Sequence, residues 1–576
     1  MGFLIAILVI LILLVIAFVI WFITYKNSGK CPLCALEKII KPTKVTMDVA
    51  NEELYANGTA LTPPMGWSSW NTFRQNISEE LLLSTAQAVK DSGLLEAGYQ
   101  YINLDDCWQS SMRDKDGKLQ GDLEKFPNGI QHLISQINRM GMKVGLYSSN
   151  GTLTCEDLPA SLGREELDAQ TISDWGCEFF KYDFCHHKIT SGEAPVIEAL
   201  EISEPGKSAG LTLYPEDAEL SGRARVLNIK KLPSGKGIGM LNHAAGKATF
   251  RPTVNKAGTY VLTLLIYKQL TVREQYLQVI VNGKINEVFT PTAKGFTPTG
   301  RVQTMIDLKE GANEIILTNP VVTAADSSFI QYRRMGNALK AAAHKTAVEK
   351  GTREKPILFS ICEWGMAFPW HWGSRAGNMW RTTPDINASW KSIHLIYNHN
   401  IKLYKYACPG AWNDPDMLEV GNGKLTDNEN KTHFSLWCMM AAPLILGNDV
   451  RLLVGSDGAP IENHPVLKTV TNRNLIAIDQ DELGKPAKRL KKMHGIDIIG
   501  RPLANGDIAV CLYNPGSRVK GISLDLSEIL TDEYLEFPQA QTYQLHELWS
   551  DERFNARTVS ASLQKHECRV YRISRQ

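Results

Sequence analysis

Eight short apolar runs that alternate with amphipathic stretches are the feature that most constrains the fold of this chain. The runs are Met65–Trp70, Tyr101–Asp106, Val144–Tyr147, Phe179–Asp183, Ile357–Glu363, Met379–Arg381, Tyr406–Trp412 and Ala442–Gly447. Helical patterns lie between them, as in Glu79–Gly93 and Gly129–Gly141, and both of these end at a glycine, a common helix stop. Buried strands that alternate with helices predict an α/β fold, a parallel (β/α)8 TIM barrel.

The barrel accounts for the eight runs only if residues 201–325 form a separate domain. Gly258–Tyr267 and Gln275–Val281 alternate like strands, Asn282-Gly283 is typical of a hairpin turn, and Asn313–Leu317 adds a further strand. We therefore expect a β-sandwich inserted in a barrel loop.

The insertion divides the barrel into residues 61–200 and 326–484. Beyond the barrel, the residue pattern of Gly500–Tyr513 and Val519–Leu526 is typical of strands. We therefore expect residues 485–576 to form a C-terminal antiparallel β-domain, which would be a second sandwich.

The N-terminus carries an uninterrupted apolar run, Phe3–Ile23, which is long enough to cross a bilayer as a helix. No Lys or Arg precedes it and no clean cleavage site follows, which favours an uncleaved transmembrane anchor at residues 1–26 over a cleaved signal peptide. Residues 27–60 are polar and predict a linker. The basic residues after the run favour a cytoplasmic body, but long domains can translocate despite such charges, so orientation stays open.

Charge and cysteine content exclude several classes of function. Lys plus Arg number 62 against 61 Asp plus Glu, so no positive excess exists to hold a nucleic acid. The 11 cysteines are too few for a disulfide scaffold, and Cys31-x-x-Cys34 without a second pair is weak evidence for zinc. The sequence has no phosphate-binding glycine loop of the P-loop type and no G-x-S-x-G nucleophile elbow. Nothing indicates an oligomeric state.

Polar residues follow most of the predicted barrel strands, where the working residues of such barrels lie. They are Asp105, Asp106, Lys181, Asp183, Glu363, Arg381, Asp385, Asp414 and Asp416, with Trp67, Trp70, Trp108, Tyr147, Trp364 and Trp412 among them. A single such Asp often only caps a helix, and a Trp more often packs than binds, but this many strand ends are poorly explained by capping. Carboxylates that accept from hydroxyl groups, together with aromatic faces, suit a sugar, and a pair of carboxylates suits glycosidic cleavage.

At these residues the sequence resembles glycoside hydrolase family 27, the α-galactosidase and α-N-acetylgalactosaminidase family. The matching segments, in the family's order, are Pro64–Asn71 (PMGWSSWN), Tyr101–Trp108 (YINLDDCW), Lys143–Ser148 (KVGLYS), Lys181–Cys185 (KYDFC), Cys362–Gly365 (CEWG), Trp380–Ile386 (WRTTPDI) and Trp412–Met417 (WNDPDM).

The resemblance implies a role for each motif residue. Asp183 would be the nucleophile and Asp385 the general acid/base of a retaining enzyme, with carboxyl groups about 5–5.5 Å apart. The other predicted substrate contacts are Asp105, Asp106 and Lys181 at the C3, C4 and C6 hydroxyls, Arg381 at the C2/C3 side, Trp70 and Tyr147 as pocket walls, and Asp416 and Met417. The resemblance implies no cofactor for catalysis.

The motif at Glu363 bears on the substrate, because family members that act on galactose carry a Glu there and those that act on N-acetylgalactosamine carry small residues. The resemblance thus implies an exo-acting α-galactosidase. α-N-acetylgalactosaminidase and β-L-arabinopyranosidase are alternatives within the family, and a sugar-binding protein on a decayed barrel is the non-enzymatic alternative.

Two further inferences rest on the resemblance. Cys155 and Cys185 match a family disulfide, whereas Cys107 has no partner and is expected to be a free, buried thiol. A disulfide requires an oxidising space, which favours an extracytoplasmic catalytic body.

The insert, at Tyr214–Gly222 and Gly258–Val261, is similar to carbohydrate-binding modules of families 6 and 35. That similarity implies a structural calcium with Glu216 as a candidate ligand, although Glu216 could equally be a surface acid. The insert would add sugar contacts, or it is purely structural.

Overall fold

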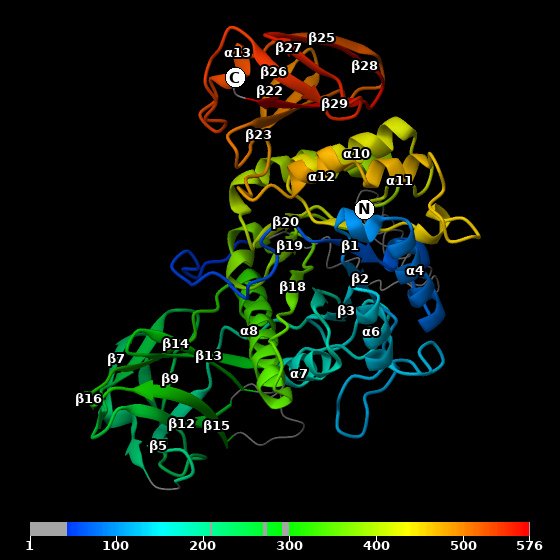
Figure 1. Ribbon diagram of the computed structural model, residues 1–576. Helices are drawn as coiled ribbons and strands as arrows, with labels where there is room; N and C mark the ends of the chain where they lie inside the picture. Colours follow the sequence, from blue (N-terminus) through cyan, green and yellow to red (C-terminus); the bar gives the residue numbers. More distant parts are fainter. Residues whose placement is uncertain (1–42, 208–209, 269–273, 291–298, 575–576) are drawn as a thin grey trace, which may run out of the picture. The chain divides into compact units, whose positions relative to one another are not determined.

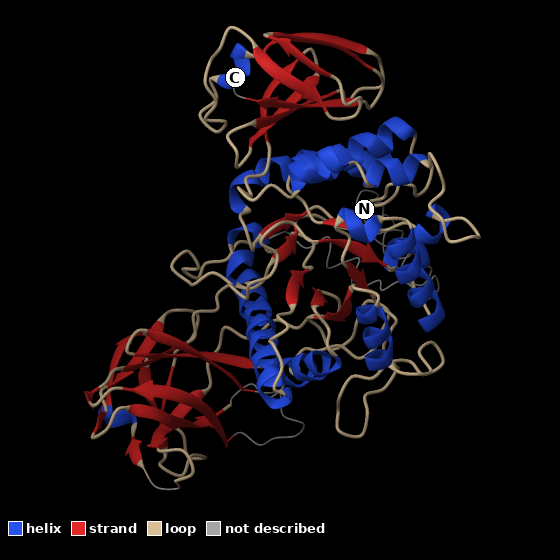
Figure 2. Ribbon diagram, in the orientation of Figure 1, coloured by secondary structure: helices blue, strands red, loops and turns tan. Residues whose placement is uncertain are grey.

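The computed structural model describes residues 43–574 except 208–209, 269–273 and 291–298 (Figures 1 and 2). The described chain divides into two compact units. The first comprises Glu52–His187 and Tyr332–574, and the second comprises Thr43–Asn51 and Lys188–Gln331. The division after Gln331 falls within helix α8 (Ala324–Lys350).

An eight-stranded parallel sheet forms the centre of the first unit and confirms the predicted barrel. Its strands are β1 (Met65–Ser68), β2 (Tyr101–Asn103), β3 (Lys143–Ser149), β4 (Phe179–Asp183), β18 (Leu358–Ile361), β19 (Met379–Arg381), β20 (Trp412–Asp414) and β21 (Leu444–Leu446). They pair in the order β20-β19-β18-β4-β3-β2-β1-β21, and a parallel bridge between Leu418 and Leu446 closes the ring. The seventh strand starts later than predicted, because η4 (Ile401–Tyr406) ends at the first residue of the predicted run and Cys408–Ala411 forms a tight turn.

Helices lie between the strands, as predicted, and two α-helices follow the last strand. They are α3 (Trp70–Phe73), α4 (Glu79–Asp91), α5 (Leu94–Ala97), α6 (Ile130–Arg139), α7 (Glu165–Trp175), α8, α9 (Trp390–Asn400), α10 (Asp427–Met439), α11 (Pro465–Val470) and α12 (Arg473–Asp479). Helix α4 begins where the side chain of Ser78 accepts a hydrogen bond from Leu81 N, and α10 begins with a capping box of Thr426 and Glu429.

An apolar layer fills one end of the barrel. Its residues include the first residue of five strands: Tyr101, Phe179, Leu358, Met379 and Trp412. Because the strands are parallel, their first residues meet at the same end, and this end is closed by packed side chains. Polar side chains lie at the opposite end of the barrel, where the strands finish.

The second unit is the predicted β-sandwich. One sheet has the order β14-β13-β17-β10-β7 and the other has β15-β12-β5-β9-β8, with β6 paired to β5. The strands are β5 (Val196–Ser203), β6 (Leu211–Leu213), β7 (Ala218–Gly222), β8 (Arg225–Asn228), β9 (Lys236–Gly239), β10 (Gly246–Phe250), β12 (Gly258–Tyr267), β13 (Gln275–Val281), β14 (Lys284–Thr290), β15 (Thr299–Leu308) and β17 (Ile315–Thr318), and β11 (Thr253–Val254) pairs with β16 (Gly311–Ala312). Asn282 and Gly283, both with positive φ, form the predicted hairpin turn between β13 and β14.

The sandwich is larger than the sequence predicts. It starts at Lys188, before the expected boundary at residue 201, because β5 lies in the middle of one of its sheets. Thr43–Asn51, predicted as part of a linker, also belong to this unit. Thr46 N donates to Asp326 Oδ1 at 2.7 Å, which ties this segment to the start of α8.

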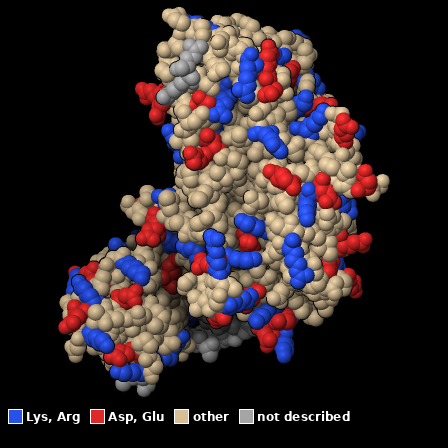
Figure 3. All heavy atoms as spheres, viewed as in Figure 1, with Lys and Arg blue, Asp and Glu red and all other residues tan. Residues whose placement is uncertain are grey.

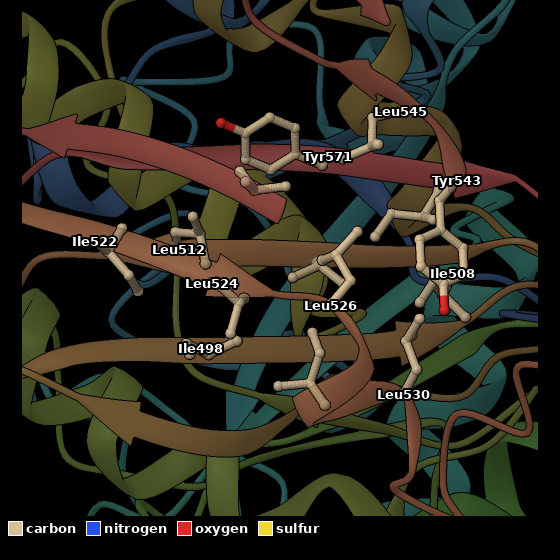
Figure 4. Close-up of a cluster of buried hydrophobic side chains, with 14 of the residues drawn as sticks. Ile498, Ile508, Leu512, Ile522, Leu524, Leu526, Leu530, Tyr543, Leu545 and Tyr571 are labelled. Atoms are coloured by element: carbon tan, nitrogen blue, oxygen red, sulfur yellow. The ribbon is translucent and has the colours of Figure 1, made fainter. Parts of the chain in front are cut away.

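The C-terminal β-domain lies in the first unit and has its own core (Figure 4). Its strands are β22 (Lys488–Met493), β23 (Ile496–Pro502), β24 (Ile508–Tyr513), β25 (Lys520–Asp525), β26 (Tyr543–Glu547), β27 (Arg553–Ala556), β28 (Thr558–Leu563) and β29 (Cys568–Ser574), with the short helix α13 (Ser527–Leu530). A six-stranded sheet, β22-β23-β24-β29-β26-β27, packs with the β25–β28 pair. Alternate residues such as Ile522 and Leu524 point into this core, as the two-residue period of a strand requires.

The predicted membrane anchor needs correction. No helix within the described ranges is both long enough and apolar enough to cross a membrane. The run Phe3–Ile23, on which that prediction and the membrane-anchored localisation rested, lies outside the described residues, as do Cys31 and Cys34. The structure therefore gives no support to a transmembrane helix, to a membrane partner or to an anchored location.

Charged side chains on the face shown in Figure 3 are mixed in sign. Lys and Arg are interspersed with Asp and Glu, and no area of a single sign covers this face. The mixture agrees with the formal net charge of +1.

Candidate active site

The predicted polar residues gather where the barrel strands end, opposite the apolar layer. Asp183 is the last residue of β4, Arg381 is the last residue of β19 and Asp414 is the last residue of β20. Asp105 and Asp106 follow β2 after one intervening residue, Leu104. Because parallel strands bring their carboxyl ends together, residues distant in sequence share one site.

Asp183 is buried and held from two sides. Its Oδ1 accepts a hydrogen bond from Phe184 N at 2.9 Å, and its Oδ2 accepts from the hydroxyl of Tyr147 at 3.1 Å. Burial raises the pKa of this carboxyl, the charge of Lys181 lowers it, and the charge of Asp385 raises it further. Asp183 is therefore a buried carboxyl whose two oxygens are both fixed by hydrogen bonds.

Lys181 links the β4 and β2 sides of the site. Its Nζ forms a salt bridge of 2.8 Å with Asp105 Oδ2 and lies 5.4 Å from the centre of the Tyr147 ring. Lys181 and Asp183 are two residues apart on one strand, so both side chains point to the same side of the sheet. Burial opposes the charge of Lys181, but Asp105 and Asp183 outweigh it and hold the pKa of this amine well above its ordinary value.

Asp106 is fixed by backbone amides. Oδ1 accepts from Cys107 N at 2.7 Å and Oδ2 accepts from Glu156 N at 3.0 Å. Burial raises the pKa of Asp106 to about 7, although these amides and a hydrogen bond from Thr154 lower it. A carboxyl with this pKa can accept from a sugar hydroxyl when ionised or donate to one when protonated.

Arg381 holds the other catalytic candidate. Its guanidinium lies 3.1 Å from Asp385 Oδ1 and 2.7 Å from Asp416 Oδ2. Asp416 Oδ2 also accepts from Ile386 N at 2.8 Å, so Asp416 positions the segment that carries Asp385. The Asp385 side chain is 54% exposed, in contrast to the buried Asp183. An exposed carboxyl can exchange protons with water, as an acid/base must.

The remaining predicted contacts surround these groups. Met417, Asp416, Arg381, Lys181 and Asp105 line a small cavity of about 40 Å³ that extends into the barrel interior. Trp70 lies in α3, on the loop after β1, with the guanidinium of Arg74 5.3 Å from the centre of its ring.

The predicted contact of Glu363 with the C2 hydroxyl stays a prediction, and the structure gives this side chain a backbone partner outside the charged groups described above. The Glu363 side chain is fully buried and its Oε2 accepts a hydrogen bond from Ala367 N at 2.6 Å. Burial raises the pKa of this carboxyl well above its ordinary value. Side chains alternate in direction along extended chain, and here the neighbouring Cys362 faces the site, with its Sγ 3.7 Å from Arg381 Nη1.

Cys362 is thus a site residue that the sequence analysis missed. Its thiol lies among Asp183, Arg381, Lys181 and Asp385, whose charges act on its pKa, although burial is the largest cause of the rise. The motif contains both Cys362 and Glu363. Neighbouring side chains in extended chain point to opposite sides, and this rule could have identified Cys362 as the alternative to Glu363.

The structure pairs Cys155 with Cys185 in a disulfide, with the two Cα atoms 5.1 Å apart. Cys107 is a free, buried thiol, as expected. Glu216 is exposed in the second unit and belongs to no cluster of three or more potential ligands in the described part of the chain. The structure therefore gives no support to the predicted calcium site at Glu216.

A family model described as "Alpha galactosidase A" matches residues 62–204 and 337–481, and a model described as "Alpha galactosidase C-terminal beta sandwich domain" matches residues 493–573. The chain belongs to the α-galactosidase A family. It is therefore a glycoside hydrolase, and the family match leaves out residues 205–336, which lie mostly in the inserted sandwich.

Relatives in this family come from plants, bacteria and fungi. Alpha-galactosidase 2 of Arabidopsis thaliana is 29% identical, over 92% of this chain and 94% of its own length. Alpha-galactosidase A of Cellvibrio japonicus is 28% identical, over 89% and 92%. The crystal structure of α-galactosidase I from Mortierella vinacea has a TM-score of 0.60 at 25% identity, covering 90% of this chain and 98% of that one.

Lys125 is a second residue that the sequence analysis missed. Its Nζ donates to Gln75 O and to Cys107 O, both at 3.0 Å, and so joins the loop after β1 to the loop after β2. Cys107 has a φ of 74° and its amide binds Asp106. Lys125 therefore supports the strained residue that orients one predicted family substrate contact.

We expect Lys125→Met to raise KM for an aryl α-galactoside roughly fivefold, about the value of one hydrogen bond, with little change in kcat. Steady-state kinetics separate the two constants. Lys125→Arg should retain most of the affinity, and Lys115→Met, on the same loop, serves as the control. Equal losses of kcat in Lys125→Met and Lys115→Met would contradict a positioning role.

The charges around Asp183 predict the pH dependence of this family member. As the predicted nucleophile, Asp183 would have to be ionised to attack, and its raised pKa would place the acidic limb of kcat/KM above the ordinary Asp range. Lys181 lowers that pKa, so Lys181→Met should move the limb to higher pH and lower activity. A pH profile of the variant with an unchanged limb would show that this limb does not report Asp183.

Proposed function

We propose that this protein is a retaining exo-α-galactosidase that releases terminal α-linked galactose by double displacement. The family match and the α-galactosidase relatives support α-galactosidase activity. The observation that carries the mechanism is the pair of carboxyls in different surroundings. Asp183 is buried beside Lys181, and Asp385 is half-exposed beside Arg381.

Each carboxyl has the surroundings that its step requires. Tyr147 and Phe184 N hold Asp183 with its oxygens fixed, so that it can attack the anomeric carbon and form a glycosyl-enzyme. Asp385 gives a proton to the leaving oxygen and then takes one from the water that hydrolyses the intermediate. In this proposal Asp105, Asp106 and Lys181 hold the galactose hydroxyls, and no cofactor takes part.

Hydrolysis of a panel of nitrophenyl glycosides by the full chain tests the activity. We expect the α-galactoside to be cleaved faster than the α-N-acetylgalactosaminide and the β-L-arabinopyranoside, and NMR to show α-galactose as the first product. Preference for either of the other two glycosides would replace the proposal. A crystal structure titled a family 27 β-L-arabinopyranosidase shares the fold with this chain at only 15% identity.

We further propose that Cys362, and not Glu363, borders the C2 side of the sugar, because Cys362 lies against Arg381. Glu363→Gln should leave the ratio of galactosidase to N-acetylgalactosaminidase activity unchanged, since the buried carboxyl is away from the site and has a raised pKa. Cys362→Ala should raise relative N-acetylgalactosaminidase activity about tenfold, because it makes space for the acetamide. A ratio that shifts in Glu363→Gln but not in Cys362→Ala would contradict this assignment.

The inserted sandwich is proposed to be a carbohydrate-binding module. Its support is the two-sheet architecture and the resemblance of Tyr214–Gly222. Its strands follow soon after Asp183 in the chain, so the module is joined to the loop of the nucleophile. Retention of the Asp183→Ala variant on an immobilised galactose-containing polysaccharide, in the presence of free galactose to fill the barrel site, tests this binding.

A further inference from the structure

Three potential metal ligands meet at the nucleophile. The Sγ atoms of Cys155 and Cys185 and a carboxylate oxygen of Asp183 all lie within 4.8 Å of one another, and Cys155 Sγ is 3.8 Å from Asp183 Oδ2. In a tetrahedral zinc site, Zn–S bonds of about 2.3 Å and a Zn–O bond of about 2.0 Å separate ligand atoms by roughly 3.5–3.8 Å. Cys155 Sγ and Asp183 Oδ2 already have this separation, whereas the two sulfur atoms, which are bonded to each other, must move apart to reach it.

The disulfide keeps this group from binding a metal, because both sulfur atoms are bonded to each other. Reduction would release two thiols whose positions do not depend on the disulfide alone. Cys185 O accepts from Ser149 Oγ at 2.8 Å, and Glu156 N, next to Cys155, donates to Asp106 Oδ2 at 3.0 Å. The loops also pack closely, since a Cβ on Gly151 would lie 1.9 Å from Cys185 O.

We propose that reduction of Cys155–Cys185 creates a binding site for zinc or another thiophilic divalent cation, with Cys155, Cys185 and Asp183 as ligands. The bound ion occupies the carboxylate that must attack the sugar, so the reduced enzyme is inhibited by the ion and the oxidised enzyme is not. The consequence for activity rests on the proposed role of Asp183 as nucleophile, whereas the binding itself does not.

The charges around the group suit a divalent cation. Two thiolates and one carboxylate supply three negative charges, and Lys181 is the nearby positive group that acts on Asp183. The Tyr147 hydroxyl lies 3.4 Å from Cys155 Sγ and 3.1 Å from Asp183 Oδ2, so it can stabilise a thiolate by donating a hydrogen bond. Cys155 is partly exposed, which gives a reductant and a metal ion access.

A phosphine can reduce the Cys155–Cys185 disulfide. The phosphine gives two electrons to the disulfide and takes the oxygen of one water molecule, so it leaves as its oxide. The two protons of the water complete the two thiols. One zinc ion then displaces two protons, one from each thiol, and the ionised carboxylate of Asp183 completes the set of protein ligands. A water molecule or substrate oxygen would take the fourth position.

The test titrates the oxidised and the phosphine-reduced full chain with zinc while following hydrolysis of an aryl α-galactoside. The reduced enzyme should lose at least about tenfold in activity and recover it on addition of a chelator, and the oxidised enzyme should change less than about twofold. Cadmium, added in place of zinc, should produce a thiolate-to-metal absorption band only in the reduced protein.

Variants separate this site from other thiols. Cys155→Ser and Cys185→Ser should remove the cadmium band and the zinc sensitivity, and Asp183→Asn should weaken cadmium binding about tenfold or more. Cys408→Ser, which changes a partly exposed free thiol elsewhere in the same unit, is the matched control and should behave as the parent.

Two results would overturn the proposed zinc site. Equal inhibition of oxidised and reduced enzyme, or a cadmium band that survives in both cysteine variants, overturns the site. If the full chain hydrolyses no galactoside, the proposed function fails, but the cadmium band still decides whether the site exists.

Discussion

Asp183→Ala is expected to lower kcat/KM for an aryl α-galactoside by about 10⁴-fold or more, because no other described carboxyl occupies the end of β4. Fold stability should change little. The variant leaves the Tyr147 hydroxyl and Phe184 N without their acceptor, at a cost of about 1–3 kcal/mol, but it also removes a buried charge. Stopped and steady-state assays measure the activity, and thermal unfolding checks the fold.

The same variant also tests the face of attack. The space left by the carboxyl can admit azide, which would attack the anomeric carbon from the nucleophile's side and yield β-galactosyl azide. Asp157→Ala, on the neighbouring loop with an exposed side chain, is the matched control and should keep normal turnover. Activity near the parent value in Asp183→Ala would refute the proposed nucleophile.

Asp385→Ala should show a loss that depends on the leaving group. For a galactoside with a poor leaving group, kcat/KM should fall about 10³-fold, because the leaving oxygen receives no proton. For an activated nitrophenyl galactoside, the first step needs little acid assistance, so the glycosyl-enzyme should accumulate and give a burst of nitrophenol. The basic limb of the pH profile should disappear.

Asp385→Ala should affect the chemistry without disturbing the fold. The Asp385 side chain is 54% exposed and Arg381 keeps its salt bridge with Asp416, so the fold should be retained. Asn387→Ala, two residues away and exposed, is the control. An equal loss for good and poor leaving groups would argue against acid/base catalysis by Asp385.

Much of the fold could be predicted from local sequence patterns. The runs Phe179–Asp183 and Met379–Arg381 coincide with β4 and β19, and Gly258–Tyr267 coincides with β12. Strand and turn preferences act over a few residues, so they are visible without the tertiary structure. The start of the sandwich was predicted too late because β5 follows the barrel strand β4 closely and reads as another buried strand.

The membrane anchor shows a limit of the same reasoning. Hydropathy alone identified Phe3–Ile23, but no helix across the described ranges 43–574 could cross a membrane. A location for the protein built on that run is not supported.

The sequence by itself determined the barrel, the order of its strands along the chain and the motifs that carry Asp183 and Asp385, because strand periodicity and short motifs are local properties. Only the tertiary structure decided which side chains face the site. It gave Glu363 a backbone partner at Ala367, set Cys362 against Arg381, and placed Lys125 between two loops. These outcomes depend on the direction of each side chain and on contacts between segments far apart in sequence, and a linear pattern contains neither.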